Sequence, residues 1–338
     1  APATPYTVNS EGKGPAWQNS LFEDNAEFGY GMAIAQNAIR DKLKEYVNEV
    51  KSLTQDENLV QACDEYLKTS DNSKDNQIAT KNLIEELEKI RKQSNLLGKF
   101  AKKILKEKDY LSKKSMWIFG GDGWAYDIGF GGLDHVIASG ENVNILVFDT
   151  EVYSNTGGQS SKATPIGSIA QFAAAGKSVK KKDLAAIAMS YGYVYVAQIA
   201  MGADYNQCIK AFNEAESYNG PSIIIAYAPC INHGIKTGMG TSQEEEKKAV
   251  ASGYWNLFRF DPRLQADGKN PFVLDSKKIT MNYRDFIMNE VRYNSLLRMS
   301  PDRAEKLFDE AEKQSKDKYE RLLKMSESSE YFEQNNLK

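Results

Sequence analysis

An aspartate between two glycines is the first feature of this 338-residue chain that could do chemistry. Gly121, Asp122 and Gly123 directly follow a short apolar run, so we expect a strand to end there. Glycines let the backbone approach a ligand closely, and a helix that begins at this point turns its first amides toward an anion. A dinucleotide-binding fingerprint is excluded, because Tyr126 stands where that motif needs its third glycine.

A second polar loop, 149–158, follows the next apolar run. Adjacent parallel strands would bring the two loops side by side, since their carboxyl ends meet at one edge of a sheet. Asp122 could then supply a carboxylate, Thr150 a hydroxyl and Val152 a backbone carbonyl. Magnesium prefers such oxygen ligands and often shares them with phosphates. The pattern predicts a magnesium site, whereas Asp122 taken alone is equally well explained as a turn residue or helix cap.

The elements that must position these loops are strands that alternate with helices. Apolar strands separated by helices are typical of an α/β fold, a doubly wound and mainly parallel sheet with helices on both faces. We expect strands over 116–119, 143–148, 194–197 and 222–227, and helices over 126–139, 182–191 and 205–218.

Two charged segments flank this core. Ser20 and Glu23 form a capping-box pattern that predicts a helix from there to about residue 48. The stretch 45–113 is rich in Lys, Glu, Asp and Asn, and we interpret it as a solvated helical insertion, with a docking surface as the alternative. We therefore predict one domain over 1–274, which contains the insertion, and a helical C-terminal extension over 275–338.

Composition narrows the class of protein. The net charge is −3, with 41% hydrophobic and 26% charged residues, which is ordinary for a globular protein and gives no reason to expect nucleic acid or membrane as a partner. Three cysteines form no disulfide framework, so we expect a reducing, cytoplasmic location. The first residues do not resemble a signal peptide, and the chain lacks an initiator Met, which suggests a piece of a longer polypeptide.

Several stretches together resemble the C-terminal, thiamine-diphosphate-binding part of the pyruvate:ferredoxin (flavodoxin) oxidoreductases. The interval of 28 residues from Asp122 to Thr150 is also typical of thiamine diphosphate enzymes. The resemblance extends over residues 1–275, and only loosely over the insertion. The stretches that carry it are 14–24, 117–135, 149–165, 191–196, 228–232 and 252–264.

The resemblance implies a cofactor site and its residues. Gly121, Asp122, Gly123 and Trp124 would hold the diphosphate, and Mg²⁺ would be bound by Asp122, Thr150 and Val152. Asn155 would lie near the thiazolium and the oxo-acid substrate, where its amide could hydrogen-bond a carbonyl, so it is the candidate catalytic residue. The loop lining the cofactor would comprise Thr150, Glu151, Val152, Tyr153, Ser154 and Asn155.

The resemblance also implies redox chemistry and partners. Cys230 would be the fourth ligand of a [4Fe-4S] cluster whose other ligands lie outside this chain, since one thiolate cannot hold a cubane. The implied reaction converts pyruvate and coenzyme A to acetyl-CoA and CO₂, with single electrons passed to ferredoxin or flavodoxin. We expect a homodimer completed by further domains of the same enzyme, and we expect the isolated chain to be inactive.

Two other functions remain open at this point. The chain could be part of a non-oxidative thiamine diphosphate enzyme, such as a decarboxylase or carboligase, or a non-catalytic module that kept the fold. For Cys230 the alternative is a buried free cysteine. Residues 180–182, three consecutive lysines, could be a docking patch for an acidic electron carrier, although we favour a solvated turn.

Overall fold

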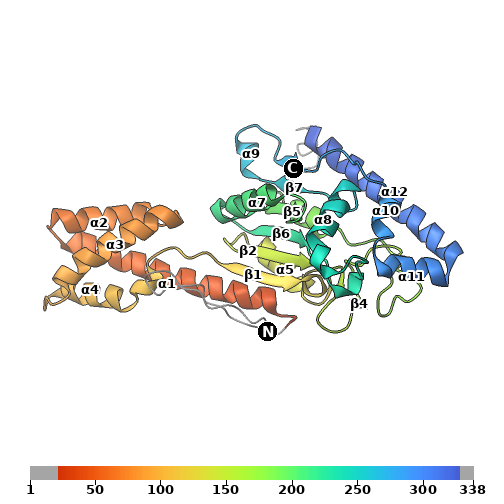
Figure 1. Ribbon diagram of the computed structural model, residues 1–338. Helices are drawn as coiled ribbons and strands as arrows, with labels where there is room; N and C mark the ends of the chain where they lie inside the picture. The colour runs from red at the N-terminus through yellow and green to blue at the C-terminus, as the bar shows by residue number, and fades with distance from the viewer. Residues whose placement is uncertain (1–21, 328–338) are drawn as a thin grey trace. The chain divides into compact units, whose positions relative to one another are not determined.

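A computed structural model describes residues 22–327. They form two compact units (Figure 1): of the described residues, unit 1 comprises 22–28 and 117–327, and unit 2 comprises 29–116. Helix α1, Asn25–Leu53, begins in the first unit and continues into the second. The predicted insertion, 45–113, lies within unit 2.

Unit 1 is built on a six-stranded sheet of order β1-β2-β6-β5-β7-β8. Its first four strands are parallel, which confirms the predicted mainly parallel sheet and each of the four predicted strands. Strand β7 pairs antiparallel with both β5 and β8, and neither β7 nor β8 was predicted, because each has only three residues. The strands are β1 (Trp117–Gly121), β2 (Asn144–Asp149), β5 (Tyr195–Ile199), β6 (Ser222–Tyr227), β7 (Phe258–Phe260) and β8 (Phe272–Leu274).

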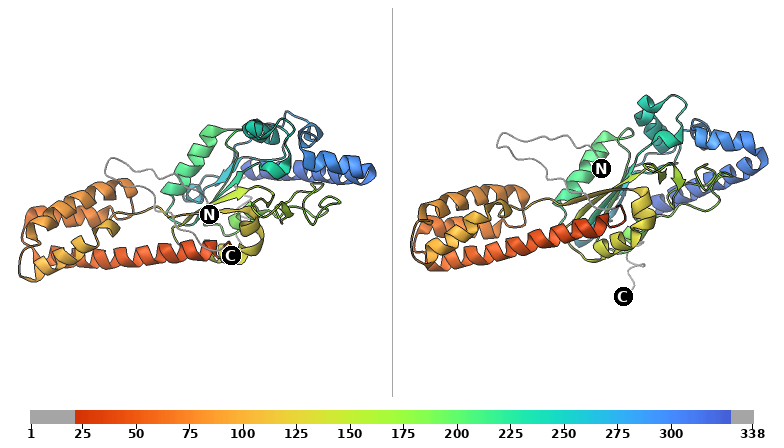
Figure 2. Two further views of the ribbon diagram at one scale, coloured as in Figure 1. Left: turned by 60° about the horizontal axis from the view of Figure 1, so that its bottom comes forward. Right: turned by 90° about the horizontal axis from the view of Figure 1, so that it is seen from below.

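Helices cover both faces of this sheet, as the uniformly apolar strands require. Helix α7, Tyr205–Ser217, packs one face through Cys208 and Ala211, which contact the Leu146 side of β2. Helix α5, Phe130–Ala138, lies on the opposite side (Figure 2). Cys208 is thus a core residue.

Shorter elements connect these layers and shape the edge where the parallel strands end. Most of them follow the carboxyl end of a strand, where a sheet of this kind presents its loops. They are η2 (Gly123–Ile128), β3 (Val152–Tyr153), β4 (Gln159–Ser160), α6 (Leu184–Met189), η3 (Ile231–His233), η4 (Met239–Thr241), α8 (Ser242–Ala251) and α9 (Arg263–Ala266).

The segment after the sheet is helical within unit 1. It comprises α10 (Tyr283–Ile287), α11 (Val291–Met299) and α12 (Pro301–Glu327). Helix α12 is strongly charged, yet it buries Phe308 and Leu322 against the same unit. Arg321 also forms an ion pair of 2.6 Å with Asp183, the N-cap residue of α6.

Unit 2 is a helical bundle with its own apolar core. Its further elements are α2 (Glu57–Lys68), α3 (Ser73–Ile90), α4 (Leu96–Lys106) and η1 (Lys108–Tyr110). Asp56, Asn72 and Asn95 cap the three α-helices by accepting hydrogen bonds from backbone amides of the first turn. Cys63, which showed no clear role in the sequence, is fully buried in this core, and burial raises the pKa of its thiol to about 12.

The predicted start of the first helix was wrong. Ser20 lies outside the described residues, but residues 22–24 form a turn and the helix begins only at Asn25. The first-turn hydrogen bond runs from the Phe28 backbone amide to the Asp24 carbonyl. The side-chain amide of Asn25, Nδ2, donates to the Phe119 carbonyl of β1 at 2.8 Å. The helix therefore begins where Asn25 contacts β1, and not at the position that the capping-box pattern indicated.

Candidate functional site

The ends of β1 and β2 meet as the sequence predicted. Gly121 pairs with Phe148 in parallel register, so the residues that follow each strand lie next to each other. The Thr150 hydroxyl lies 2.8 Å from Asp122 Oδ1 and 2.9 Å from the Val152 carbonyl oxygen. A carboxylate, a hydroxyl and a backbone carbonyl thus converge on one point.

Ser161 joins this cluster, although sequence reasoning missed it. Its hydroxyl donates to Asp122 Oδ2 at 2.6 Å, and the residue is buried. Asp122 has only 1% of its surface exposed. Burial, together with repulsion from Asp149, raises the pKa of Asp122 to about 7, so the carboxylate is held where its charge is poorly stabilised.

Strands β3 and β4 form a hairpin that carries the predicted cofactor loop. Tyr153 covers Gly123 so closely that a Cβ there would lie 2.5 Å from its ring, which explains the glycine. Ser154 and the exposed Asn155 lie in the turn of the hairpin. Asn155 is therefore open to a ligand, and its role as a catalytic residue stays a prediction.

The residues of the predicted diphosphate segment, 121–124, differ in how closely side chains cover them. Trp124 is buried, and its indole fills the space beside Gly120 and Gly129, where an added Cβ would lie 2.2 Å and 2.1 Å from it. The indole thus packs in the interior. Gly123 is covered by the Tyr153 ring, whereas a Cβ on Gly121 would meet only the Phe148 carbonyl oxygen, at 3.9 Å. Diphosphate binding by this segment stays a prediction.

Glu151 points away from the cluster, although it lies between two of its members. Its residue is buried, and its carboxylate accepts hydrogen bonds from Arg292 at 2.7 Å and Tyr254 at 2.6 Å. Lys181 Nζ lies 2.9 Å from the same carboxylate. Burial opposes ionisation, but these cations hold the pKa of Glu151 well below its usual range.

Lys181 shows that the three-lysine segment is not one surface patch. It also pairs with Asp149 at 2.8 Å, and Lys182 donates to the Tyr126 carbonyl, so only Lys180 is exposed. The expectation of a solvated turn was therefore wrong for Lys181. Consecutive lysines usually lie in solvent, but here the buried carboxylates of Asp149 and Glu151 require a cation.

The loop after β6 lies beside the hairpin. A Cβ on Gly158 would lie 2.7 Å from the Asn232 side-chain oxygen. The backbone amide of Cys230 donates to His233 Nδ1 at 3.0 Å, so the proton of a neutral imidazole lies on Nε2, which faces Glu151 at 3.6 Å. Burial lowers the pKa of His233 to about 4, which keeps it neutral. Cys230 is partly exposed, unlike the other two cysteines.

The charges of this region fit a divalent cation. Asp122, Asp149, Glu151 and Glu290 are buried. Lys181 pairs with Asp149 and Glu151, and Arg292 pairs with Glu151 and Glu290. Asp122 forms no ion pair with a described residue and accepts hydrogen bonds from Thr150 and Ser161 instead. Within residues 22–327 no group of three His, Cys, Asp or Glu side chains could hold a metal. The donor set at Asp122 is instead the mixed oxygen set that magnesium accepts.

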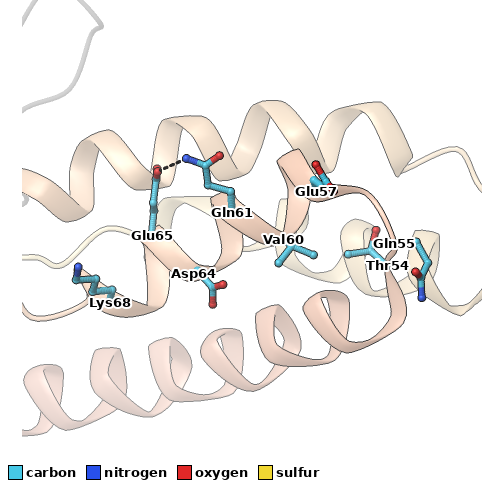
Figure 3. A pocket seen from close by; sticks show the side chains of 8 residues that line it. All are labelled: Thr54, Gln55, Glu57, Val60, Gln61, Asp64, Glu65 and Lys68. Carbon is cyan, nitrogen blue, oxygen red and sulfur yellow. Dashed lines mark hydrogen bonds between the residues drawn. The ribbon is translucent and has the colours of Figure 1, made fainter.

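A separate groove lies in unit 2 (Figure 3). It has a volume of about 590 Å³ and is lined by polar and charged side chains of α2 and the turn before it, where Gln61 donates to Glu65 at 2.9 Å. Asp64 and Lys68 also line it. None of the residues predicted to do chemistry lies in this groove.

Comparisons with known proteins identify relatives of this chain. Residues 101–226 match the family "Thiamine pyrophosphate enzyme, C-terminal TPP binding domain". The chain is 55% identical over 330 residues to a pyruvate:ferredoxin oxidoreductase of Moorella thermoacetica, covering 97% of this chain and 28% of that protein. It is 51% identical over 326 residues to a pyruvate-flavodoxin oxidoreductase of Klebsiella pneumoniae, covering 96% and 28%.

A third relative carries a different electron acceptor in its name. This pyruvate dehydrogenase [NADP(+)] of Euglena gracilis is 49% identical over 304 residues, which cover 90% of this chain and 17% of that protein. The resemblance identified in the sequence is confirmed, and the matched region includes a thiamine diphosphate domain. The chain spans about 28% of the length of the first two relatives. Among the described residues, no helix is long and apolar enough to cross a membrane.

Proposed function

We propose that this chain forms one wall of the active site of a pyruvate:ferredoxin or pyruvate:flavodoxin oxidoreductase. The observation that carries the proposal is the convergence of Asp122, Thr150 and the Val152 carbonyl at the ends of two adjacent parallel strands. It occurs in a chain 55% identical to an enzyme of that name. The whole enzyme would act on pyruvate and coenzyme A as a homodimer in the cytoplasm.

In this proposal Asp122, Thr150 and Val152 hold Mg²⁺, and the backbone at Gly121 and Gly123 receives the diphosphate. Bound there, thiamine diphosphate would supply the electron sink that decarboxylation of a 2-oxo acid requires. Ser161 fixes the orientation of the Asp122 carboxylate through its 2.6 Å hydrogen bond, so both oxygens of that group are already directed. Asn155, exposed in the hairpin turn, orients the substrate carbonyl.

Cys230 is the proposed [4Fe-4S] ligand contributed by this chain. Its partial exposure and its place in a loop beside the hairpin support this role, since a buried core cysteine could not reach a cluster outside the chain. The other ligands would come from elsewhere in the full-length polypeptide. This placement favours an oxidative reaction over the alternative, a non-oxidative decarboxylase or carboligase.

The test uses the anaerobically purified full-length polypeptide that contains this chain. We expect pyruvate with coenzyme A to drive reduction of ferredoxin, flavodoxin or a viologen dye, and 2-oxoglutarate to drive it far more slowly. NADP⁺ should be assayed in parallel, because one relative is named for that acceptor. No reduction with either acid, from protein shown to hold iron and thiamine diphosphate, would refute the proposal.

A further inference from the structure

Glu151 lies between two of the proposed magnesium ligands in an unfavourable backbone conformation. Its φ is +60°, in the left-handed region that residues with a side chain rarely adopt. Thr150 and Val152 precede and follow it, so this conformation sets how their oxygens are directed. Within the loop, the Glu151 backbone amide donates to Asp149 Oδ1 at 3.2 Å, and further contacts hold the Glu151 side chain and carbonyl.

The further contacts come from distant parts of the chain. The Glu151 carboxylate accepts from Arg292 Nη2 at 2.7 Å, and its backbone carbonyl accepts from the Thr164 hydroxyl at 2.6 Å. Arg292 is 141 residues further along the chain and is itself buried. Its Nε donates to Glu290 at 2.7 Å, so one planar guanidinium connects two carboxylates.

The segment that carries Arg292 also binds two other loops of the site. We call residues 289–292 the strut. The Val291 amide donates to the Gly234 carbonyl at 2.9 Å, and the Asn289 carbonyl accepts from the Lys236 amide at 3.0 Å. The Arg292 carbonyl accepts from the Ile169 amide at 2.9 Å. The strut thus ties the metal loop to the loop that follows Cys230.

We propose that Glu151 and Arg292 form a positioning pair, which holds the proposed magnesium ligands Thr150 and Val152 in place without touching the metal. The inference rests on the proposed function, because it concerns the same magnesium site. If the pair is broken, Glu151 can leave its left-handed conformation and the two ligand oxygens turn apart. Partners behind a metal ligand typically change metal affinity by about 10- to 100-fold.

The experiment measures binding of Mn²⁺, as a probe for Mg²⁺, to the full-length polypeptide with thiamine diphosphate present. The signal of free Mn²⁺ in electron paramagnetic resonance reports the dissociation constant without any need for turnover. We expect Arg292→Lys to weaken Mn²⁺ binding by about 10-fold or more, since one ammonium cannot replace the guanidinium fork. At saturating metal, kcat should return to near the wild-type value, because only ligand placement has been weakened.

Arg259→Lys is the matched control. Arg259 is also a buried arginine that connects two acidic residues, Glu214 at 2.7 Å and Asp275 at 2.9 Å. It lies on β7, and neither of its partners belongs to the site loops. This variant should lower the melting temperature as Arg292→Lys does, but leave Mn²⁺ affinity within about twofold of the wild type.

Glu151→Gln provides a second variant if Arg292→Lys does not fold. It keeps the shape of the side chain and removes its charge, and we expect a similar loss of Mn²⁺ affinity. The double variant should lose less than the sum of the two single losses, because both substitutions disrupt the same contact between Glu151 and Arg292. If either folded single variant bound Mn²⁺ with an affinity within twofold of the wild type, this inference would be wrong, but the proposed function would stand. Failure of the wild-type protein to bind Mn²⁺ with thiamine diphosphate would instead overturn the proposed function.

Discussion

The two units bury their polar residues in different ways. In unit 2 the buried Arg40 donates to the carbonyls of Ser70 and Leu111 and to the amide oxygen of Asn76. In unit 1 the buried Arg292 and the partly buried Lys181 face carboxylates. No described residue of unit 2 is a buried Asp or Glu, whereas unit 1 buries Asp122 and Asp149.

This difference distinguishes buried polar groups that stabilise the fold from buried charges that could bind a ligand. Neutral acceptors satisfy Arg40 and tie the end of unit 2 to its helices without leaving any negative charge in the interior. In unit 1 the buried Asp122 lies near Asp149 and forms no ion pair with a described residue, so it is an excess of negative charge that is costly to bury. Such an excess persists where a ligand compensates it, so unit 1 is the unit to test for metal and cofactor.

The largest effect should come from Asp122→Asn in the full-length polypeptide. The amide keeps the size of the carboxylate but cannot supply its charge, so we expect pyruvate-dependent turnover to fall by about 1000-fold or more, equivalent to about 4 kcal/mol. The melting temperature without added metal should not fall, since the variant removes repulsion with Asp149. A variant that still binds Mn²⁺ with thiamine diphosphate normally would contradict the assigned site.

A core substitution in unit 2 tests whether this unit can be destabilised without a change in metal binding by unit 1. Leu83 is fully buried among the helices, and Leu83→Ala should destabilise unit 2 by about 3 kcal/mol through lost burial and a cavity. Thermal or urea unfolding measures this loss. At temperatures where the variant is folded, Mn²⁺ affinity should be unchanged, and a tenfold change would show that the two units are not separable in function.

A smaller loss of stability is expected when the ion pair between α12 and the start of α6 is removed. Lys318 and Arg321 outweigh burial and hold the pKa of Asp183 at about 2, below its ordinary value of 3.8. The charge therefore stabilises the fold above pH 3.8, and the contribution disappears as the pH falls toward 2. Asp183→Asn keeps the helix cap, so it should cost about 1–2 kcal/mol at pH 7, because Arg321 is partly in solvent.

Comparing the unfolding of this variant and of the wild type at several pH values checks that prediction. The difference between them should shrink below pH 4 and leave metal affinity unaffected at pH 7. A difference that stayed constant down to pH 2.5 would mean that the ion pair contributes nothing and that the amide disturbs packing instead.

Local patterns were sufficient for much of the fold. The four parallel strands were predictable because each is a continuous apolar run bounded by turn residues. The start of α1 was mispredicted, because the Ser20 and Glu23 pattern indicates a helix that the structure begins only at Asn25. Strands β7 and β8 carried too few residues to show a period.

The sequence by itself determined the order of strands and helices and the residues at the strand ends, because Asp122, Thr150 and Val152 need only two neighbouring parallel strands to meet. Only the tertiary structure decided what surrounds them. Ser161 reaches Asp122 across 39 residues and Arg292 reaches Glu151 across 141. Such pairs produce no periodic pattern in the sequence, because they form where loops from separate elements pack against one another. The residues between the two partners do not predict the contact.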